Sequence, residues 1–366
     1  MHLNSRKLAA AAVSAMALPL ALAGCSGDSA GSDGGSATLT FSTFLTEDHP
    51  ASVAAQAWMS QVTDATDGSV EFETFYNASL CEAPESIACA ENGTADVVLA
   101  VPAYTPEMLL ANIGSTTFVT KDLQANSDAI NALYADEPDF QAEYSDRNQR
   151  MLFQFNNSMP VLVTKDPVTS FDALSGKDIR ASGSMVNGIS ALGVNPVAID
   201  PAEIYESLER GVVAGAAFPV ESVVDYRLTE VAPNAYDLGE WMGSYAMNSY
   251  TMNQGAYDGL SADQQEAIDS VSSEIAGSYV DEFLIPAVEE NCRALAAEGI
   301  ELQSLGPVDD GEAWVAAAGG TQQSTWVEGA SSATDDAEAF YNSYVDRVAD
   351  LESGDAPTTA EICASA

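Results

Sequence analysis

The chain is poor in basic residues and in histidine. Its 366 residues include 12 Lys and Arg, 55 Asp and Glu, and 2 His. This shortage of positive charge argues against nucleic-acid binding, because phosphates need a basic face, and against attachment to anionic lipid through a basic patch. Hydrophobic residues make up 46 % of the chain, so it can bury a sizeable core. The acids are spread along the chain and predict a strongly solvated surface.

The sequence also lacks the motifs of several enzyme classes. It contains no phosphate loop, no Gly-x-Gly-x-x-Gly fingerprint and no Asp-x-Asp-x-Asp-Gly calcium loop. His2 lies in a leader described next, which leaves His49 alone and excludes a multi-histidine zinc site. We therefore expect a protein that is not an enzyme and that holds no metal and no cofactor. His49 precedes Pro50, a pair that predicts the start of a helix.

The N-terminus has the pattern of an export signal. Arg6 and Lys7 precede an apolar stretch, residues 8–20, that is too short to span a bilayer. The following Leu-Ala-Gly-Cys, which ends at Cys25, resembles the lipobox of bacterial lipoproteins. The resemblance implies that residues 1–24 are a signal peptide and that Cys25 is diacylated, which anchors the protein to the outer face of the bacterial cell membrane. An ordinary signal peptide with a chance cysteine is the alternative.

Residues 25–37 are rich in Gly and Ser and predict a flexible tether. Without residues 1–24 the basic residues fall to 10, because Arg6 and Lys7 are removed, while all 55 acids remain.

Four further cysteines predict two disulfides outside the cytosol, with three possible connectivities. We favour the local pairing of Cys81 with Cys89 and of Cys292 with Cys363. On one continuous helix, Cys81 and Cys89 would lie about 12 Å apart, which is too far to bridge. Pro84 predicts that the helix begins after Cys81, so this pairing stays possible.

Alternating strand and helix patterns predict an α/β protein with two blocks, residues 38–156 and 157–244. A helical stretch over 261–298, which Pro286 should kink or split, would span about 57 Å, more than one domain. We therefore expect a two-lobe, periplasmic-binding-protein-like fold with hinge crossings and a long helix that spans both lobes. The expected lobe I is 38–156 plus 245–283, and lobe II is 157–244 plus 284–350. Residues 311–352 should be helical with a break at Gly319 and Gly320, followed by an irregular tail over 351–366.

One run of motifs resembles the solute receptors of TRAP (tripartite ATP-independent periplasmic) transporters. It comprises residues 174–180 (LSGKDIR), 191–197 (ALGVNPV) and 203–215, with the Asp-His-Pro at 48–50 and the Thr-Asp-Gly at 66–68 in support. The resemblance implies a receptor that closes on an organic acid and delivers it to a membrane permease driven by an ion gradient. A solute-binding lipoprotein of an ATP-driven importer is the alternative.

The family arginine that holds a ligand carboxylate falls on Arg180. Physical chemistry favours the same role, because a strongly acidic body repels anions and needs a local cation to capture one. Arginine offers a planar fork that fits a carboxylate. Arg180 also ends a predicted strand, and clefts of α/β folds lie at strand ends. A structural ion pair with one of the 55 acids is the alternative role.

Departures from the family pattern concern the ligand. Phe218 stands at the ligand-contacting Asn position, and Phe44, Val101 and Pro160 stand where sialic-acid receptors are polar, Pro160 replacing a second arginine. This implies a pocket with one guanidinium and apolar or aromatic walls, which favours an apolar or aromatic monocarboxylate over the family's C4-dicarboxylates. Plain core packing is the alternative role for Phe44 and Phe218. Further wall residues are suggested by position alone: Ser184, Met185 and Trp241.

Overall fold

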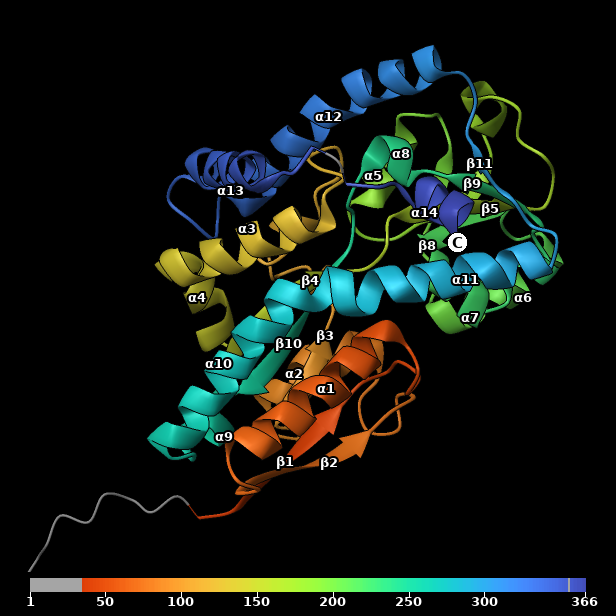
Figure 1. The fold of residues 1–366 in the computed structure, drawn as a ribbon. Coiled ribbons are helices and arrows are strands. Elements are labelled where there is room, and N and C mark those ends of the chain that lie inside the picture. The colour runs from red at the N-terminus through yellow and green to blue at the C-terminus, as the bar shows by residue number, and fades with distance from the viewer. Residues whose placement is uncertain (1–34, 355) are drawn as a thin grey trace, which may run out of the picture. The chain divides into compact units, whose positions relative to one another are not determined.

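The computed structural model describes residues 35–354 and 356–366. The predicted signal peptide, the lipidation site Cys25 and most of the tether lie outside the described residues. Within the described part, no helix is both long enough and apolar enough to cross a membrane. The strands form two sheets (Figure 1), and we call each sheet with its helices a lobe.

The sheet of the first lobe has five strands in the order β2-β1-β3-β10-β4. β1 pairs in parallel with β2 and β3, whereas β10 lies antiparallel between β3 and β4. The strands are β1 Ala37–Ser42, β2 Val70–Phe75, β3 Val97–Ala100, β4 Gln149–Asn156 and β10 Met247–Asn253. The associated helices are α1 Pro50–Ala65, α2 Ser86–Glu91, α3 Leu123–Asp136, α4 Pro138–Ser145, α9 Gln254–Asp258 and α10 Ala262–Tyr279.

The sheet of the second lobe has six strands in the order β11-β9-β5-β8-β6-β7. Its strands are β5 Pro160–Thr164, β6 Asp178–Arg180, β7 Asn195–Val197, β8 Gly215–Pro219, β9 Asn234–Asp237 and β11 Leu302–Ser304. Its helices are α5 Met185–Ser190, α6 Ile204–Arg210, α7 Val220–Asp225, α8 Gly239–Met242, α11 Ile285–Ala297 and α14 Thr359–Ser365. The short strands β6 and β8 are parallel, so their carboxyl ends lie together at one edge.

Several segments connect the two sheets. The chain crosses between β4 and β5 and returns between α8 and β10. The predicted long helix is present as α10, a π-helical turn at Val280–Leu284, and α11. The turn lies just before Pro286, which has no N–H to donate to the preceding turn. α10 packs on α1 and β4 of the first lobe, and α11 packs on α7 of the second, so the helical run spans both lobes (Figure 1).

Two expectations for the C-terminal part are wrong. α12 (Val308–Ala330) continues through Gly319 and Gly320, because each glycine costs a helix only about 1 kcal/mol relative to alanine and packing can offset that cost. The tail is irregular only before Thr359, because α14 follows and begins with a capping box between Thr358 and Glu361. α14 is tied down further by the backbone N–H of Ala360, which donates to Asp237 Oδ2 over 2.8 Å.

The lobe boundaries remain a prediction, but one segment belongs elsewhere than expected. α13 (Ala337–Leu351) packs on α3, and the Tyr344 hydroxyl donates to Asn126 Oδ1 of that helix over 2.6 Å. We therefore place α13 with the first lobe rather than with residues 284–330.

The disulfides have the pairing that the sequence favoured. Cys81 is joined to Cys89 with Cα atoms 6.4 Å apart, and Cys292 is joined to Cys363 with Cα atoms 4.9 Å apart. Cys81 precedes the helical turn that begins at Ala83, so the pair does not lie on one continuous helix. The second disulfide fastens α14 to α11.

Candidate functional site

A cavity of about 70 Å³ lies where both sheets end. From the first lobe it is lined by the segments that follow β1 and β3, including Phe44, His49 and Tyr104. From the second lobe it is lined by residues that follow β6 and by the end of β8, including Phe218. The crossing between β4 and β5 contributes Asn157 to the wall, and the crossing between α8 and β10 contributes Tyr245 and Ala246. This is the position at which open α/β sheets bind ligands.

Arg180 ends β6 and is 1 % exposed; it is not itself among the residues that line the cavity, but it packs against Phe218, which is. Its Nε donates to the carbonyl of Ile199 and its Nη1 to the carbonyl of Ala217, each over 3.3 Å. The guanidinium carbon lies 4.4 Å from the centre of the Phe218 ring, which is cation–π geometry. These contacts fix the side chain, and a guanidinium has five N–H donors, so the two carbonyls use only part of its capacity.

Arg180 has no acidic partner among the described residues. The ion pairs found there use other arginines: Arg150, Arg210, Arg227, Arg293 and Arg347. Burial lowers the pKa of Arg180, while Tyr104 and Tyr245 oppose this shift. The side chain stays charged, because arginine does not deprotonate in proteins. No acidic side chain forms an ion pair with Arg180 in the described part of the chain, although Asp200 is near enough to oppose the lowering of its pKa.

Three tyrosines that sequence reasoning missed also line the cavity: Tyr104, Tyr226 and Tyr245. Burial raises the pKa of each hydroxyl, so all three are neutral and can donate hydrogen bonds at physiological pH. Tyr104 and Tyr245 are also close enough to Arg180 to affect its pKa. The position of Tyr104 just after a predicted buried strand was the available signal.

A polar group lies on the first-lobe side of the same cavity. His49 caps α1 through Nδ1, which accepts from the backbone N–H of Ala51 over 3.2 Å, and so confirms the predicted helix start. Asn157 belongs to the first crossing, and Asn248 lies near the start of β10. The Nδ2 of Asn248 donates to Asn157 Oδ1 over 2.9 Å. Both amides lie at the predicted lobe boundaries, which could have identified them.

Only some of the predicted site residues lie at this cavity. Phe44, Val101 and Phe218 line it. Pro160 does not, because it pairs with Pro219 inside the sheet and its carbonyl accepts from Leu238.

Ser184 and Met185 are also absent from the lining. Ser184 donates to the backbone carbonyls of Ser115 and Tyr245, and Met185 is fully buried in the core of the second lobe. The helix α5 begins there, so the preceding Ser182 and Gly183 line the cavity instead.

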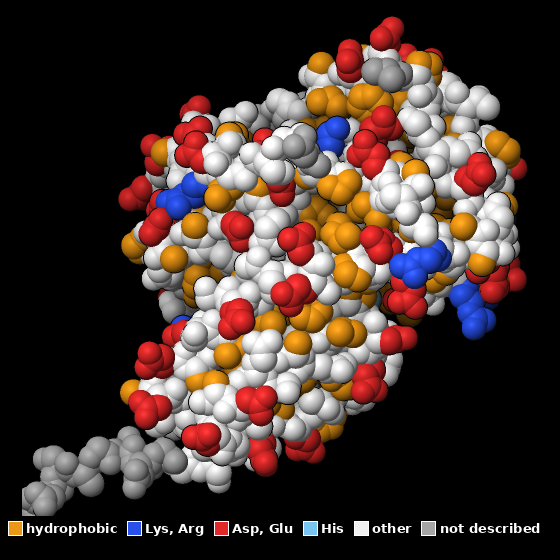
Figure 2. Space-filling model, viewed as in Figure 1, with side chains coloured by type: hydrophobic (Ala, Val, Ile, Leu, Met, Phe, Trp, Pro, Cys, Tyr) orange, Lys and Arg blue, Asp and Glu red, His pale blue; other side chains and the backbone are white. Residues whose placement is uncertain are grey.

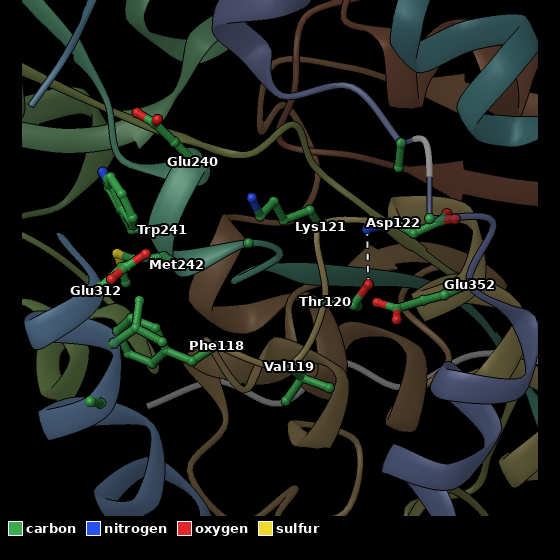
Figure 3. A pocket seen from close by; sticks show the side chains of 15 residues that line it. Phe118, Val119, Thr120, Lys121, Asp122, Glu240, Trp241, Met242, Glu312 and Glu352 are labelled. Carbon is green, nitrogen blue, oxygen red and sulfur yellow. Dashed lines mark hydrogen bonds between the residues drawn. The ribbon is translucent and has the colours of Figure 1, made fainter. Parts of the chain in front are cut away.

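Trp241 lies at a different cavity of about 620 Å³, shown in Figure 3. Trp241 comes from α8 and packs against Gly311 of α12, and Phe118 and Lys121 come from a loop of the first-lobe sequence. Glu240, Glu312 and Glu352 also line it, so this space is acidic and does not suit an anion. The prediction of Trp241 as a wall of the Arg180 site was therefore wrong.

Comparison with known proteins identifies the chain. The family described as bacterial extracellular solute-binding protein, family 7 (DctP), matches residues 41–324. This chain belongs to that family. The expected resemblance to TRAP solute receptors and the expected two-lobe α/β fold are confirmed.

Three similar proteins have a ligand in their name or title. The ectoine-binding periplasmic protein TeaA of Halomonas elongata is 22 % identical over 256 residues, which cover 68 % of this chain and 73 % of TeaA. The crystal structure of a TRAP solute-binding protein from Rhodoferax ferrireducens with copurified benzoate has a TM-score of 0.77 and 20 % identity. The match covers 86 % of this chain and 98 % of that protein. The crystal structure of a marine metagenome TRAP solute-binding protein with 3-hydroxybenzoate has a TM-score of 0.76 and 21 % identity. The match covers 87 % of this chain and 99 % of that protein.

Proposed function

We propose that this family 7 protein is the extracytoplasmic receptor of a TRAP-type secondary transporter and that it captures an organic monocarboxylate with an apolar or aromatic body. The observation that carries the proposal is Arg180, a buried cation with no ion-pair partner in the described chain, held at a strand end against Phe218, which lines the cavity. The carboxylate of the ligand supplies the missing charge.

Arg180 binds the carboxylate through N–H groups that its two backbone carbonyl partners leave free. Phe218 covers one face of the guanidinium and so keeps water from the ion pair. Because the cavity is lined by both lobes, the ligand contacts both, and its binding free energy favours the closed arrangement.

The other walls restrict the body of the ligand. Phe44, Val101 and Phe218 offer apolar and aromatic surface, which stabilises an apolar body by removing it from water. A second carboxylate would find no second arginine here, because Pro160 stands at that position within the sheet. The benzoate and 3-hydroxybenzoate in the two solved relatives are ligands of this chemical class.

The setting of the receptor is part of the proposal. We infer that residues 1–24 are removed, that Cys25 carries acyl chains that anchor the protein outside the cell membrane, and that the closed receptor delivers its acid to the permease subunits. Globomycin-sensitive processing and mass spectrometry of the mature N-terminus test the anchor.

A thermal-shift panel on the purified soluble body tests the ligand class. The panel contains benzoate, 3-hydroxybenzoate, a branched aliphatic acid, succinate and sialic acid. At about 100 times the dissociation constant, a binding acid should raise the unfolding midpoint by roughly 5 °C. Mass spectrometry of copurified ligand supplements the panel. Stabilisation by succinate or sialic acid, with none by the aromatic or branched acids, would overturn the proposal.

A further inference from the structure

One acceptor at the cavity is buried and unused. Asn248 is 3 % exposed, and its Nδ2 donates to Asn157 Oδ1 over 2.9 Å. Its Oδ1 is buried and has no hydrogen-bond partner within the described part of the chain. A buried amide oxygen is normally satisfied, so an orphan in the wall of a ligand cavity indicates a donor supplied by the ligand.

A donor lies in the same wall. His49 is 6 % exposed, and its Nδ1 is occupied as an acceptor from the backbone N–H of Ala51. Burial lowers the pKa of His49 to about 4, so the ring is neutral at physiological pH. In a neutral ring whose Nδ1 accepts, the proton is on Nε2. None of the hydrogen bonds found in residues 35–354 and 356–366 uses this N–H.

We propose that Asn248 and His49 form a second ligand subsite, on the first-lobe side of the cavity, that recognises a hydroxyl group on the body of the acid. A hydroxyl is both donor and acceptor, so it can donate to Asn248 Oδ1 and accept from His49 Nε2. This deepens the proposed function, on which it rests: the ligand is a hydroxy-substituted monocarboxylate rather than an unsubstituted one.

The two subsites lie on different lobes. Arg180 ends a strand of the second sheet, whereas Asn248 belongs to β10 of the first sheet and His49 caps α1. A ligand that satisfies both subsites therefore bridges the lobes. The hydroxyl contact is made only when the lobes are closed around the acid, so it adds to closure as well as to affinity.

Calorimetry with three matched probes tests the subsite in the unmodified protein: benzoate, 3-hydroxybenzoate and 3-methoxybenzoate. The methoxy group accepts but cannot donate, so it isolates the contact to Asn248 Oδ1. We expect the hydroxy acid to bind about tenfold more tightly than benzoate, and the methoxy acid to lose that gain. Equal affinity of benzoate and 3-hydroxybenzoate overturns the subsite alone. Failure of all three acids to bind overturns the proposed aromatic ligand and the subsite with it.

The variant Asn248→Leu locates the effect. It removes the acceptor and should reduce the preference for 3-hydroxybenzoate over benzoate to about onefold. The ratio of the two affinities within one variant is the readout, so a general change in stability cancels. A preference that survives in Asn248→Leu would show that the hydroxyl is bound elsewhere.

Discussion

Replacing Arg180 with alanine should abolish tight ligand binding. The guanidinium is 1 % exposed and would be the charge partner of a buried carboxylate. Loss of one member of a buried, hydrogen-bonded charge pair costs about 2–5 kcal/mol, because the other charge stays buried and unpaired. That range corresponds to a roughly 30-fold to several-thousand-fold weaker affinity.

The same substitution should change the fold little. In the free protein Arg180 is a buried charge with no ion pair in the described chain, and removing it relieves the cost of its desolvation. The loss of two long hydrogen bonds and of the contact with Phe218 acts in the opposite direction. These terms partly cancel, and we expect the free energy of unfolding to change by less than about 2 kcal/mol.

Two measurements and one control test the predicted effects of Arg180→Ala on ligand affinity and on stability. Calorimetry with the best acid of the thermal-shift panel gives the affinity, and urea unfolding gives the stability. Arg210→Ala is the matched control, because it removes the same charge from a side chain that is 70 % exposed and paired only with Glu206. Unchanged affinity in Arg180→Ala refutes the reasoning. An equal loss in Arg210→Ala would instead assign the effect to the overall charge.

Two further predictions concern charge. Burial raises the pKa of Asp237 to about 6, above its ordinary value, so its carboxylate destabilises the fold at neutral pH. Protonation of this carboxyl should raise the free energy of unfolding as pH falls from 7.5 towards 4.5, while His49, whose pKa is lowered to about 4, acts in the opposite direction. The difference in urea midpoint between Asp237→Asn and the unmodified protein should therefore change over this pH range, and a constant difference would refute the assignment. Ligand association should accelerate as salt rises from about 0.01 to 0.15 M, since screening weakens repulsion by the acidic surface more than it weakens a buried contact. Stopped-flow fluorescence measures the rate, and slower association in salt would contradict this.

Much of the fold could be predicted because its signals are local. Alternating and continuous apolar runs identified the strands, and His49 with Pro50 identified the start of α1. The errors have a common cause, namely that tertiary contacts decided the outcome. Gly319 and Gly320 remain helical within α12, and α14 is held by the disulfide to Cys292 and by Asp237. The disulfide was predicted, but the hydrogen bond from Ala360 to Asp237 joins residues far apart in the sequence and is not visible in a window of neighbouring residues.

The site was predicted less completely, for geometric reasons. Arg180, Phe44, Val101 and Phe218 follow or end strands, and strand ends converge whatever the loops do. The lining by Tyr226 and Asn157 depends on how helices and crossings pack, which sequence spacing does not determine. Trp241 was predicted in the site because it lies close in sequence to the crossing between α8 and β10. Packing instead places it at the other cavity.

The charge distribution explains how so acidic a protein can select an anion. Figure 2 shows Asp and Glu scattered over the visible face with few Lys and Arg among them. Several arginines are paired with neighbouring acids at the surface, whereas Arg180 is buried against the Phe218 ring and forms no ion pair in the described chain, which under the proposed function leaves its charge for the ligand. The surface field opposes every anion, and it opposes a dianion about twice as strongly as a monoanion. In the proposed site Arg180 is the one guanidinium that packs against the cavity wall within the described chain, so the second charge of a dianion would gain no partner. The acidic surface and the single arginine therefore act in the same direction, in favour of a monocarboxylate.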